Sequence, residues 1–425
     1  MTVVEIVASA SIGNGTPVER LVCHPRLPMV AALERARPAV HVWDCGTGAL
    51  RELGIVGAES STYGDTDRWQ RTPAVAWHPD QPLLLISGED GVVQWTAAGL
   101  GKPDGVPPTA SYRGMTFSPD GQTLWASPSS RGGNDAWAHS DVLDLAKGTV
   151  STGPQWDTGA VPHPAGGLVA TLCSDQGATL GLFARVDSET TPAVLRVLRR
   201  ALVLDADGYE APVFSQDGRH VAIRGNAYEN SLEVFAFPTL HRVLATTLGD
   251  PSPGYPYPPE WLAQMRAWSR HNIAFGARPG VLWVGTPKGT LLEVDVDDRH
   301  AVEHDVLAGS PVTALCATRA GELVVATGAG DLVLLSVLPA PGAAQAIDDE
   351  APRAAVAAFL ASTSEVPDDG DLWDHLVTTD GTRAWTPDDL ATVTTATTTD
   401  PSWLRLQAAV NKQISASGQP EYPKE

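Results

Sequence analysis

An all-β fold built from seven similar units is the fold class that the sequence predicts, and three observations support it. One pattern recurs along residues 3–337: a short apolar strand, a turn rich in Pro, Asp and Gly, and a second apolar strand. The apolar stretches are short and rich in β-branched residues, which favour strands over helices. The length of 425 residues exceeds what a single hydrophobic core usually serves, so a repetitive architecture with a divided core is expected.

Each unit opens with a strand that ends at a turn. In the second unit VAWHPD leads into LLLIS, and in the third MTFSPDG leads into TLWAS. Proline cannot continue a central strand, so the chain must turn at these points. A third strand and a more polar fourth segment follow, which predicts a four-stranded sheet for each unit. The residues before the seven turns are Cys23, Trp77, Phe117, Pro162, Phe214, Phe275 and Cys316.

The seventh unit has no fourth strand of its own, because the strand pattern stops at LSVLPAPG. The segment Val3–Ser9 has a strand pattern and belongs to no other unit. We expect this N-terminal strand to complete the last sheet and to close a ring of seven sheets. The predicted architecture is a seven-bladed β-propeller over residues 1–339, in which closure removes exposed sheet edges.

The third strands carry a short signature. Trp43-Asp44 ends the third strand of the first unit, and Leu143-Asp144 and Val294-Asp295 are weaker forms of the same dipeptide. These residues resemble the WD-repeat β-propeller family, over roughly residues 3–337. The chain lacks the Gly-His dipeptide that is typical of the family before the first strands, so it resembles a divergent member. The resemblance implies a non-enzymatic protein that assembles complexes.

From about residue 340 the strand pattern gives way to helix signals and acidic residues. Residues 349–362 are rich in helix formers and begin with acidic side chains. Thr386-Pro387 and Asp400-Pro401 each place a capping residue before a proline at a first helical position. The sequence therefore predicts a small, peripheral α-helical appendage over residues 340–425, ending in a frayed tail.

Charge and composition exclude several functional classes. The net charge of −21 without basic clusters argues against nucleic-acid or membrane partners. The longest apolar run, residues 354–361, is too short to span a bilayer, and the N-terminal segment does not resemble a secretory signal. A cytoplasmic, bacterial protein is expected. The four cysteines form no Cys-x-x-Cys pair, which favours reduced thiols over disulfides or zinc.

The sequence contains none of the common catalytic, phosphate-binding or metalloprotease motifs. Histidines recur at one turn position in three units, but serines fill the same position in two others, so turn capping is favoured over a metal ring. The five residues are His24, His78, His163, Ser118 and Ser215. We expect no metal, no cofactor and no catalytic residue.

Long insertions in three units fall on connections that a propeller places on one face. They are residues 57–72, 127–141 and 250–270, and they are rich in aromatic residues and arginine, which dominate binding hot spots. The predicted partner-binding residues are Tyr63, Arg68, Trp69, Arg71, Arg131, Trp137, Tyr255, Tyr257, Trp261 and Trp268. The spacing of Trp261 and Trp268 also fits a helix that packs on its own protein, so internal packing is the alternative for these two rings.

Three functional hypotheses follow. The first is a protein–protein interaction scaffold that binds a partner through the three long loops. The alternative is a propeller enzyme of the lactonase, lyase or hydrolase type, with its site at the central channel. Converging carboxylates or histidines in the channel would favour the enzyme, and an apolar channel would favour the scaffold. A third hypothesis is a regulatory sensor component of a bacterial signalling or defence system.

Overall fold

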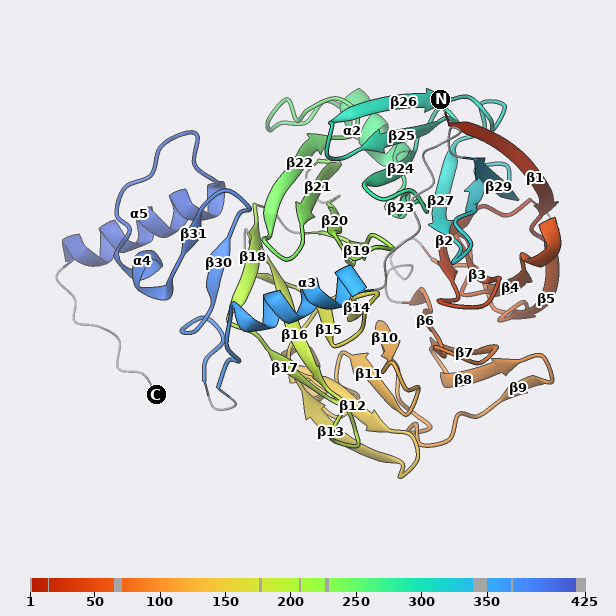
Figure 1. Ribbon diagram of the computed structural model, residues 1–425, viewed down its shortest axis with the longest axis horizontal. Coiled ribbons are helices and arrows are strands. Elements are labelled where there is room, and N and C mark those ends of the chain that lie inside the picture. The colour runs from red at the N-terminus through yellow and green to blue at the C-terminus, as the bar shows by residue number, and fades with distance from the viewer. Residues whose placement is uncertain are drawn as a thin grey trace.

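The computed structural model describes residues 2–13, 15–64, 71–175, 178–205, 208–225, 229–338, 350–367 and 370–417. Within them the chain is mainly β-structure, and its strands form seven sheets that follow one another in chain order (Figure 1). Six sheets have four strands, and the sheet of the fourth unit has seven. The predicted all-β class with seven repeated sheets is therefore confirmed.

The strands of a unit pair as consecutive antiparallel neighbours. The first sheet contains β2 (Val18–Cys23), β3 (Met29–Glu34), β4 (Val40–Asp44) and β5 (Arg51–Val56), with the 3-10 turn η1 (Gly46–Gly48). The second contains β6 (Ala74–Trp77), β7 (Leu83–Gly88), β8 (Gly91–Thr96) and β9 (Gly99–Gly101). The third contains β10 (Gly114–Phe117), β11 (Thr123–Ser127), β12 (Ser140–Asp144) and β13 (Thr149–Gly153), with the 3-10 helix η2 (Gly133–Ala138).

The fifth and sixth sheets repeat this order. The fifth contains β19 (Val213–Phe214), β20 (His220–Arg224), β21 (Ser231–Ala236) and β22 (His241–Thr247). Helix α2 (Pro259–Ala267) precedes the sixth sheet, which contains β23 (Ile273–Phe275), β24 (Val281–Gly285), β25 (Leu291–Asp295) and β26 (His300–His304). In every unit the turns from first to second and from third to fourth strand lie at one end of the sheet, called here the turn face. The remaining connections lie at the opposite end, called here the loop face.

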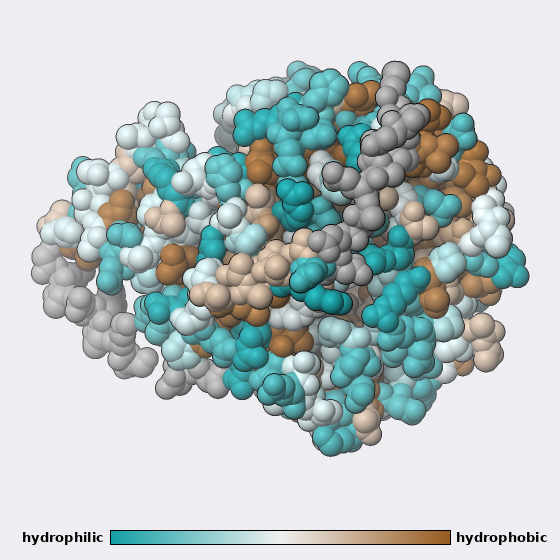
Figure 2. Space-filling model, viewed as in Figure 1, coloured by the Kyte–Doolittle hydropathy of each residue, from teal (hydrophilic) through white to brown (hydrophobic). Residues whose placement is uncertain are grey.

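The two ends of the repeat region meet in the seventh sheet. It contains β27 (Val312–Ala317), β28 (Leu323–Thr327), β29 (Asp331–Leu338) and, as its outer strand, β1 (Val3–Ser11). β1 pairs antiparallel with β29, from Val3 opposite Leu338 to Ser11 opposite Asp331. The predicted pairing of the N-terminal strand with the last unit is confirmed. Val3, Ile6 and Val7 of β1 are exposed, and apolar side chains are visible along this rim of the molecule (Figure 2).

The hydrophobic core is divided between neighbouring sheets. Each pair of consecutive sheets shares one buried cluster, as expected for strands that are apolar on both faces. The first and seventh sheets share a further cluster, in which Val18 and Val30 pack with Val324 and Leu334. This circular sequence of clusters is compatible with a propeller-like fold.

The turn face is held by side-chain caps. His24 Nδ1 accepts hydrogen bonds from the backbone N–H groups of Arg26 and Leu27, each at 3.0 Å. His78 and His163 cap their turns in the same way. Ser118 and Ser215 instead accept a hydrogen bond from the N–H five residues on, of Thr123 and His220, and so hold the two ends of the turn together. The predicted turn-capping role of these five residues is confirmed.

The turn histidines also join neighbouring sheets. His163 Nε2 lies 3.0 Å from the carbonyl oxygen of Gly218 in the next unit, and His24 Nε2 lies 2.9 Å from that of Gln81. Gly218 has a φ of +66°, and a Cβ there would collide with the His163 ring. The turn therefore requires glycine both for its backbone angle and for the close approach of the histidine.

The C-terminal region extends the fourth sheet. That sheet contains β14 (Val161–Pro162), β15 (Leu168–Asp175), β16 (Ala178–Asp187), β17 (Val194–Val197) and β18 (Arg200–Leu204), followed by β30 (Val377–Thr379) and β31 (Ala384–Trp385). β30 pairs with β18 in parallel. Helices α3 (Glu350–Ala361), α4 (Pro387–Thr392) and α5 (Ser402–Ser417) complete the region, and α4 begins with a capping box at Thr386.

Two features of this region differ from the prediction of a peripheral, purely helical appendage. It contributes two strands, which are too short to produce a recognisable sequence pattern. Helix α3 lies across the turn face (Figure 1), where Phe359 is fully buried and its ring centroid lies 5.0 Å from that of Phe183 and 5.1 Å from that of Phe237. The expectation that α3 is peripheral is wrong, because Val356 and Phe359 belong to the cluster shared by the fourth and fifth sheets.

Candidate functional site

The three long insertions emerge on the loop face. Residues 57–72 join β5 to β6, residues 127–141 join β11 to β12, and residues 250–270 join β22 to β23. All three are connections of the fourth-to-first or second-to-third type, which places them at the same end of their sheets. The opposite end carries short turns and is partly covered by α3, since Val356 lies against the β14–β15 turn at Gly167. The loop face is thus the elaborated one.

The loop of residues 127–141 is organised by one buried carboxylate. Asp141 is completely buried and accepts hydrogen bonds from Ser129 Oγ at 2.7 Å, from Ser130 N at 2.9 Å and Ser130 Oγ at 2.6 Å, and from Tyr112 OH at 3.0 Å. Burial chiefly, together with the neighbouring Asp141 charge, raises the pKa of Tyr112, so its hydroxyl remains a donor. These bonds fix the loop that presents Trp137, of which 41% is exposed.

The loop of residues 250–270 carries a row of aromatic rings. Trp261 is buried and donates its indole N–H to the carbonyl oxygens of Asp250 and Pro251. Tyr257 stacks on Trp261 with centroids 5.0 Å apart, and Tyr255 meets Tyr257 edge-on at 6.0 Å. Tyr255 is 89% exposed. The row therefore begins at Trp261, whose indole is fixed by hydrogen bonds, and ends at Tyr255, whose ring lies in solvent.

A buried arginine attaches this loop to the fifth sheet. Arg224 donates to Asn230 Oδ1 at 2.6 Å and to Asn272 Oδ1 at 3.2 Å, and Asn230 donates to the backbone oxygen of Met265 in α2. Among the described residues, the hydrogen-bond partners of its guanidinium are neutral oxygens, and burial lowers the pKa of Arg224 to about 10. α2 is thus fixed to the propeller through a hydrogen-bonded network rather than through its apolar side chains alone.

Several predicted contact residues are placed away from solvent. Trp261 is only 7% exposed, and Trp268 is half-buried against the cluster shared by the fifth and sixth sheets. Trp261 packs within its own loop, against Tyr257 and the carbonyl oxygens of Asp250 and Pro251, and Trp268 packs on the two sheets. The structure therefore favours the alternative of internal packing for these two rings over partner contact. Arg71 is neutralised by Glu89, with Nε 2.6 Å from Oε1, and its guanidinium lies over the Tyr63 ring.

The remaining predicted residues divide into exposed groups and groups that the structure does not describe. Arg131 is about half exposed, with its Nε 3.8 Å from Asp141 Oδ1. Among the described residues of this face, Tyr255 and Trp137 are the large exposed rings, and Tyr257 is half-buried next to Tyr255. Arg68 and Trp69 lie outside the described residues, so their binding role stays a prediction.

A charged cluster missed by sequence reasoning lies where inner strands of three sheets converge. Arg20 belongs to β2 of the first sheet, Glu210 precedes β19, and Arg270 and His271 precede β23. Arg270 Nε and His271 Nδ1 each lie 3.8 Å from a carboxylate oxygen of Glu210. Arg20 and His271 both interact electrostatically with Glu210. No sequence motif could reveal this group, because its members come from units far apart in the chain.

The cluster has partly desolvated charges. Burial is the main cause that lowers the pKa of His271, although Glu210 opposes this effect, so the imidazole is neutral near pH 7. Burial likewise lowers the pKa of Arg20. The carboxylate of Glu210 thus lies within 3.8 Å of both the Arg270 guanidinium and the His271 imidazole, which places an acid and a neutral base side by side.

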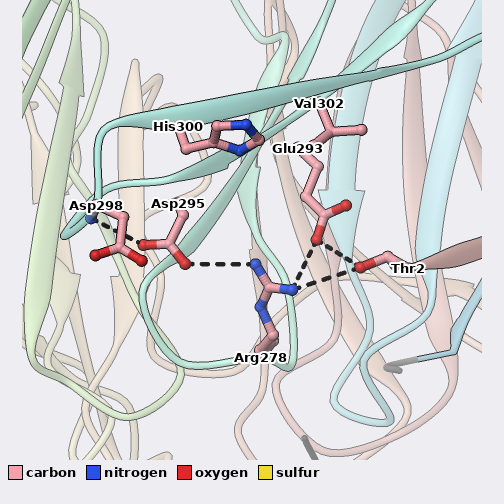
Figure 3. Close-up of a pocket in the computed structure, with 7 residues that line it drawn as sticks. All are labelled: Thr2, Arg278, Glu293, Asp295, Asp298, His300 and Val302. Carbon is pink, nitrogen blue, oxygen red and sulfur yellow. Dashed lines mark hydrogen bonds and ion pairs between the residues drawn. The ribbon is translucent and has the colours of Figure 1, made fainter. Parts of the chain in front are cut away.

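A pocket at the turn end of the sixth sheet has a structural role. Arg278 Nη1 lies 2.9 Å from Glu293 Oε1 and Nη2 lies 3.5 Å from Asp295 Oδ2, while Thr2 Oγ1 donates to Glu293 at 2.6 Å (Figure 3). Its main charges are thus paired with one another, and they tie the start of β1 to β25. In the described parts of the chain, no group of three His, Cys, Asp or Glu residues is arranged to hold a metal ion.

No protein-family model matches the chain, and no curated protein matches its sequence. No helix among the described residues is long and apolar enough to cross a membrane.

Proposed function

We propose that the chain is a closed seven-bladed β-propeller of the WD-repeat type that acts as a non-enzymatic scaffold and binds a protein partner through the loop face. A cytoplasmic location in a bacterial cell, without a cofactor, is part of the same proposal. The observation that carries it is Tyr255, which is 89% exposed at the end of a row of rings anchored by Trp261.

The physical argument is preorganisation. A large ring in solvent gains nothing for the fold, whereas at an interface it buries much apolar area with little loss of rotamer freedom. The stacked Tyr257 and the hydrogen-bonded Trp261 restrict where Tyr255 can lie, which reduces the entropy lost on binding. Trp137, on a loop fixed by Asp141, supplies a second exposed ring on the same face.

The test is partner capture from cells of the source organism with the full chain and two variants, Tyr255→Ala and Trp137→Ala. Each variant should weaken capture by roughly thirtyfold, which corresponds to about 2 kcal/mol for a hot-spot ring, and should leave the melting temperature within about 1 °C of the wild type. Trp373→Ala is the matched control, because Trp373 is 48% exposed but lies in the C-terminal region. Equal capture by all four proteins would overturn the loop-face assignment.

A second candidate is an enzyme or small-ligand protein with its site at the charged cluster. The observation that favours it is the approach of His271 and Glu210 to within 3.8 Å, since a neutral imidazole beside a carboxylate can act as a general base. His271→Gln separates the two functions. Loss of a lactonase, lyase or hydrolase activity with unchanged partner capture would favour the enzyme, whereas unchanged behaviour in both assays would leave the scaffold as the better proposal.

A further inference from the structure

Two cysteine thiols face each other where the first and seventh sheets meet. Cys23 is the last residue of β2, and Cys316 lies in β27. Their Sγ atoms are 2.7 Å apart, although 293 residues separate them in the sequence. β2 and β27 are the innermost strands of their sheets and lie side by side, so this pair spans the junction between the two ends of the repeat region.

The surroundings of the pair are apolar but not sealed. Both residues are partly buried and pack on the cluster shared by the first and seventh sheets, whose members include Leu21 and Ala314. Cys45 is a third, buried thiol in this cluster, whereas Cys173 lies in β15 of the fourth sheet. A small reagent can therefore approach Cys23 or Cys316 more readily than either of the other two thiols.

We propose that Cys23 and Cys316 are an oxidation site that forms a disulfide between the first and seventh sheets when the protein meets a low-molecular-weight disulfide. This inference rests on the thiol geometry and is independent of partner binding. A bond at this position would join the two ends of the repeat region covalently, in addition to the pairing of β1 with β29.

The chemistry is two successive thiol–disulfide exchanges. The Cys23 thiolate attacks one sulfur of the reagent R–S–S–R, forms a mixed disulfide and releases R–S⁻, which takes up the proton lost from Cys23. Cys316 then loses its proton and attacks the Cys23 sulfur, which forms the protein disulfide and releases a second R–SH. Two protein thiols are oxidised and one reagent disulfide is reduced to two thiols.

The order of attack follows from burial. Burial is the main cause that raises the pKa of Cys316, and its contact with Cys23 raises it further. A protonated thiol is a poor nucleophile in an intermolecular reaction. Cys316 is therefore the resolving thiol, because its proximity to Cys23 compensates for its low thiolate fraction.

The experiment treats the full chain with oxidised glutathione, alkylates the remaining thiols in denaturant and measures the intact mass and the peptide map. The expected result is a fall from four alkylated cysteines to two, with Cys23 and Cys316 in one cross-linked peptide. The oxidised protein should melt higher by on the order of 5 °C, because the cross-link closes a very long loop.

Two variants identify the pair without relying on the melting temperature. Cys173→Ser should cross-link like the wild type, and Cys23→Ser should retain all of its remaining thiols. Four free thiols in the oxidised wild type, a stable mixed disulfide with glutathione, or a cross-link from either residue to Cys45 would each overturn the proposal.

Discussion

The turn face and the loop face are built from the same strands but differ in how their backbone is held. On the turn face, histidine and serine caps satisfy the turn N–H groups, and His24 and His163 also reach the next sheet. On the loop face, long insertions depend on a few buried polar residues such as Asp141 and Arg224, and they leave Trp137 and Tyr255 outside. Side chains on the turn face stabilise the fold, whereas the exposed rings on the loop face are free to contact another molecule.

The largest expected effect belongs to the turn face. Phe359→Ala should lower the free energy of unfolding by about 3–5 kcal/mol, because it removes a fully buried ring that packs on Phe183 and Phe237. Chemical denaturation measures this loss, and partner capture at a temperature where the variant is folded should be unchanged. A denaturation curve that coincides with that of the wild type would mean that α3 is not part of the core.

A smaller loss is expected from Asp141→Asn on the loop face. An amide nitrogen would face the hydroxyl and N–H donors that the carboxylate now accepts, at a cost of about 1–3 kcal/mol. Limited proteolysis should cut residues 127–141 faster, and capture through Trp137 should weaken.

Asp135→Asn provides the control for that prediction. Asp135 is exposed in the same loop, so its neutralisation changes the charge equally while keeping the Asp141 network intact. If both variants behave alike, charge rather than the buried network determines the loop.

Mild acid should lower the stability of the fold through the turn-face histidines, at a higher pH than that at which carboxylates take up protons. Burial lowers the pKa values of His24 and His163 below their ordinary value of about 6.5, so the unfolded chain binds protons more readily than the folded chain. Their contribution to stability is complete above about pH 6.5 and is lost as the pH falls through their folded pKa values. Thermal unfolding measured from pH 8 to pH 5 should show this decline.

His163→Asn sharpens the pH prediction. The variant keeps an acceptor for the turn but has no titrating ring and cannot reach Gly218, so it should be less stable at pH 8 and should lose less stability toward pH 5. Carboxylates titrate at lower pH. For example, hydrogen bonds from Thr397 and Arg383 lower the pKa of Asp400 to about 2. An unchanged slope between pH 8 and pH 5 in this variant would remove His163 from the explanation.

The features predicted from the sequence are those determined by local pattern. The turn before each second strand, the outer strand predicted at Val3–Ser9 and the capping residue Thr386 before Pro387 all depend on residues a few positions apart. The same is true of the turn caps at His24 and Ser118. Short-range regularity of this kind is visible in a single sequence.

The features that the sequence did not predict depend on contacts between segments that are far apart in the chain. β30 pairs with β18 across more than a hundred residues, and three residues of strand leave no periodic signal. Glu210 and His271, or Cys23 and Cys316, become neighbours only when the sheets are arranged around a common centre. Composition correctly identified the loops rich in aromatic residues, but it could not tell that Trp261 points inward and Tyr255 outward.

The pairing of β1 with β29 determines when the seventh sheet can fold during synthesis of the chain. Ser11 and Asp331, which meet in this pairing, are separated by 320 residues, and translation at roughly 5–20 residues per second takes tens of seconds to cover them. During that interval the nascent chain carries an apolar strand with exposed Val3 and Ile6 but no partner. The seventh sheet can form only after its last strand, β29, has left the ribosome, so β1 remains without its native partner until then.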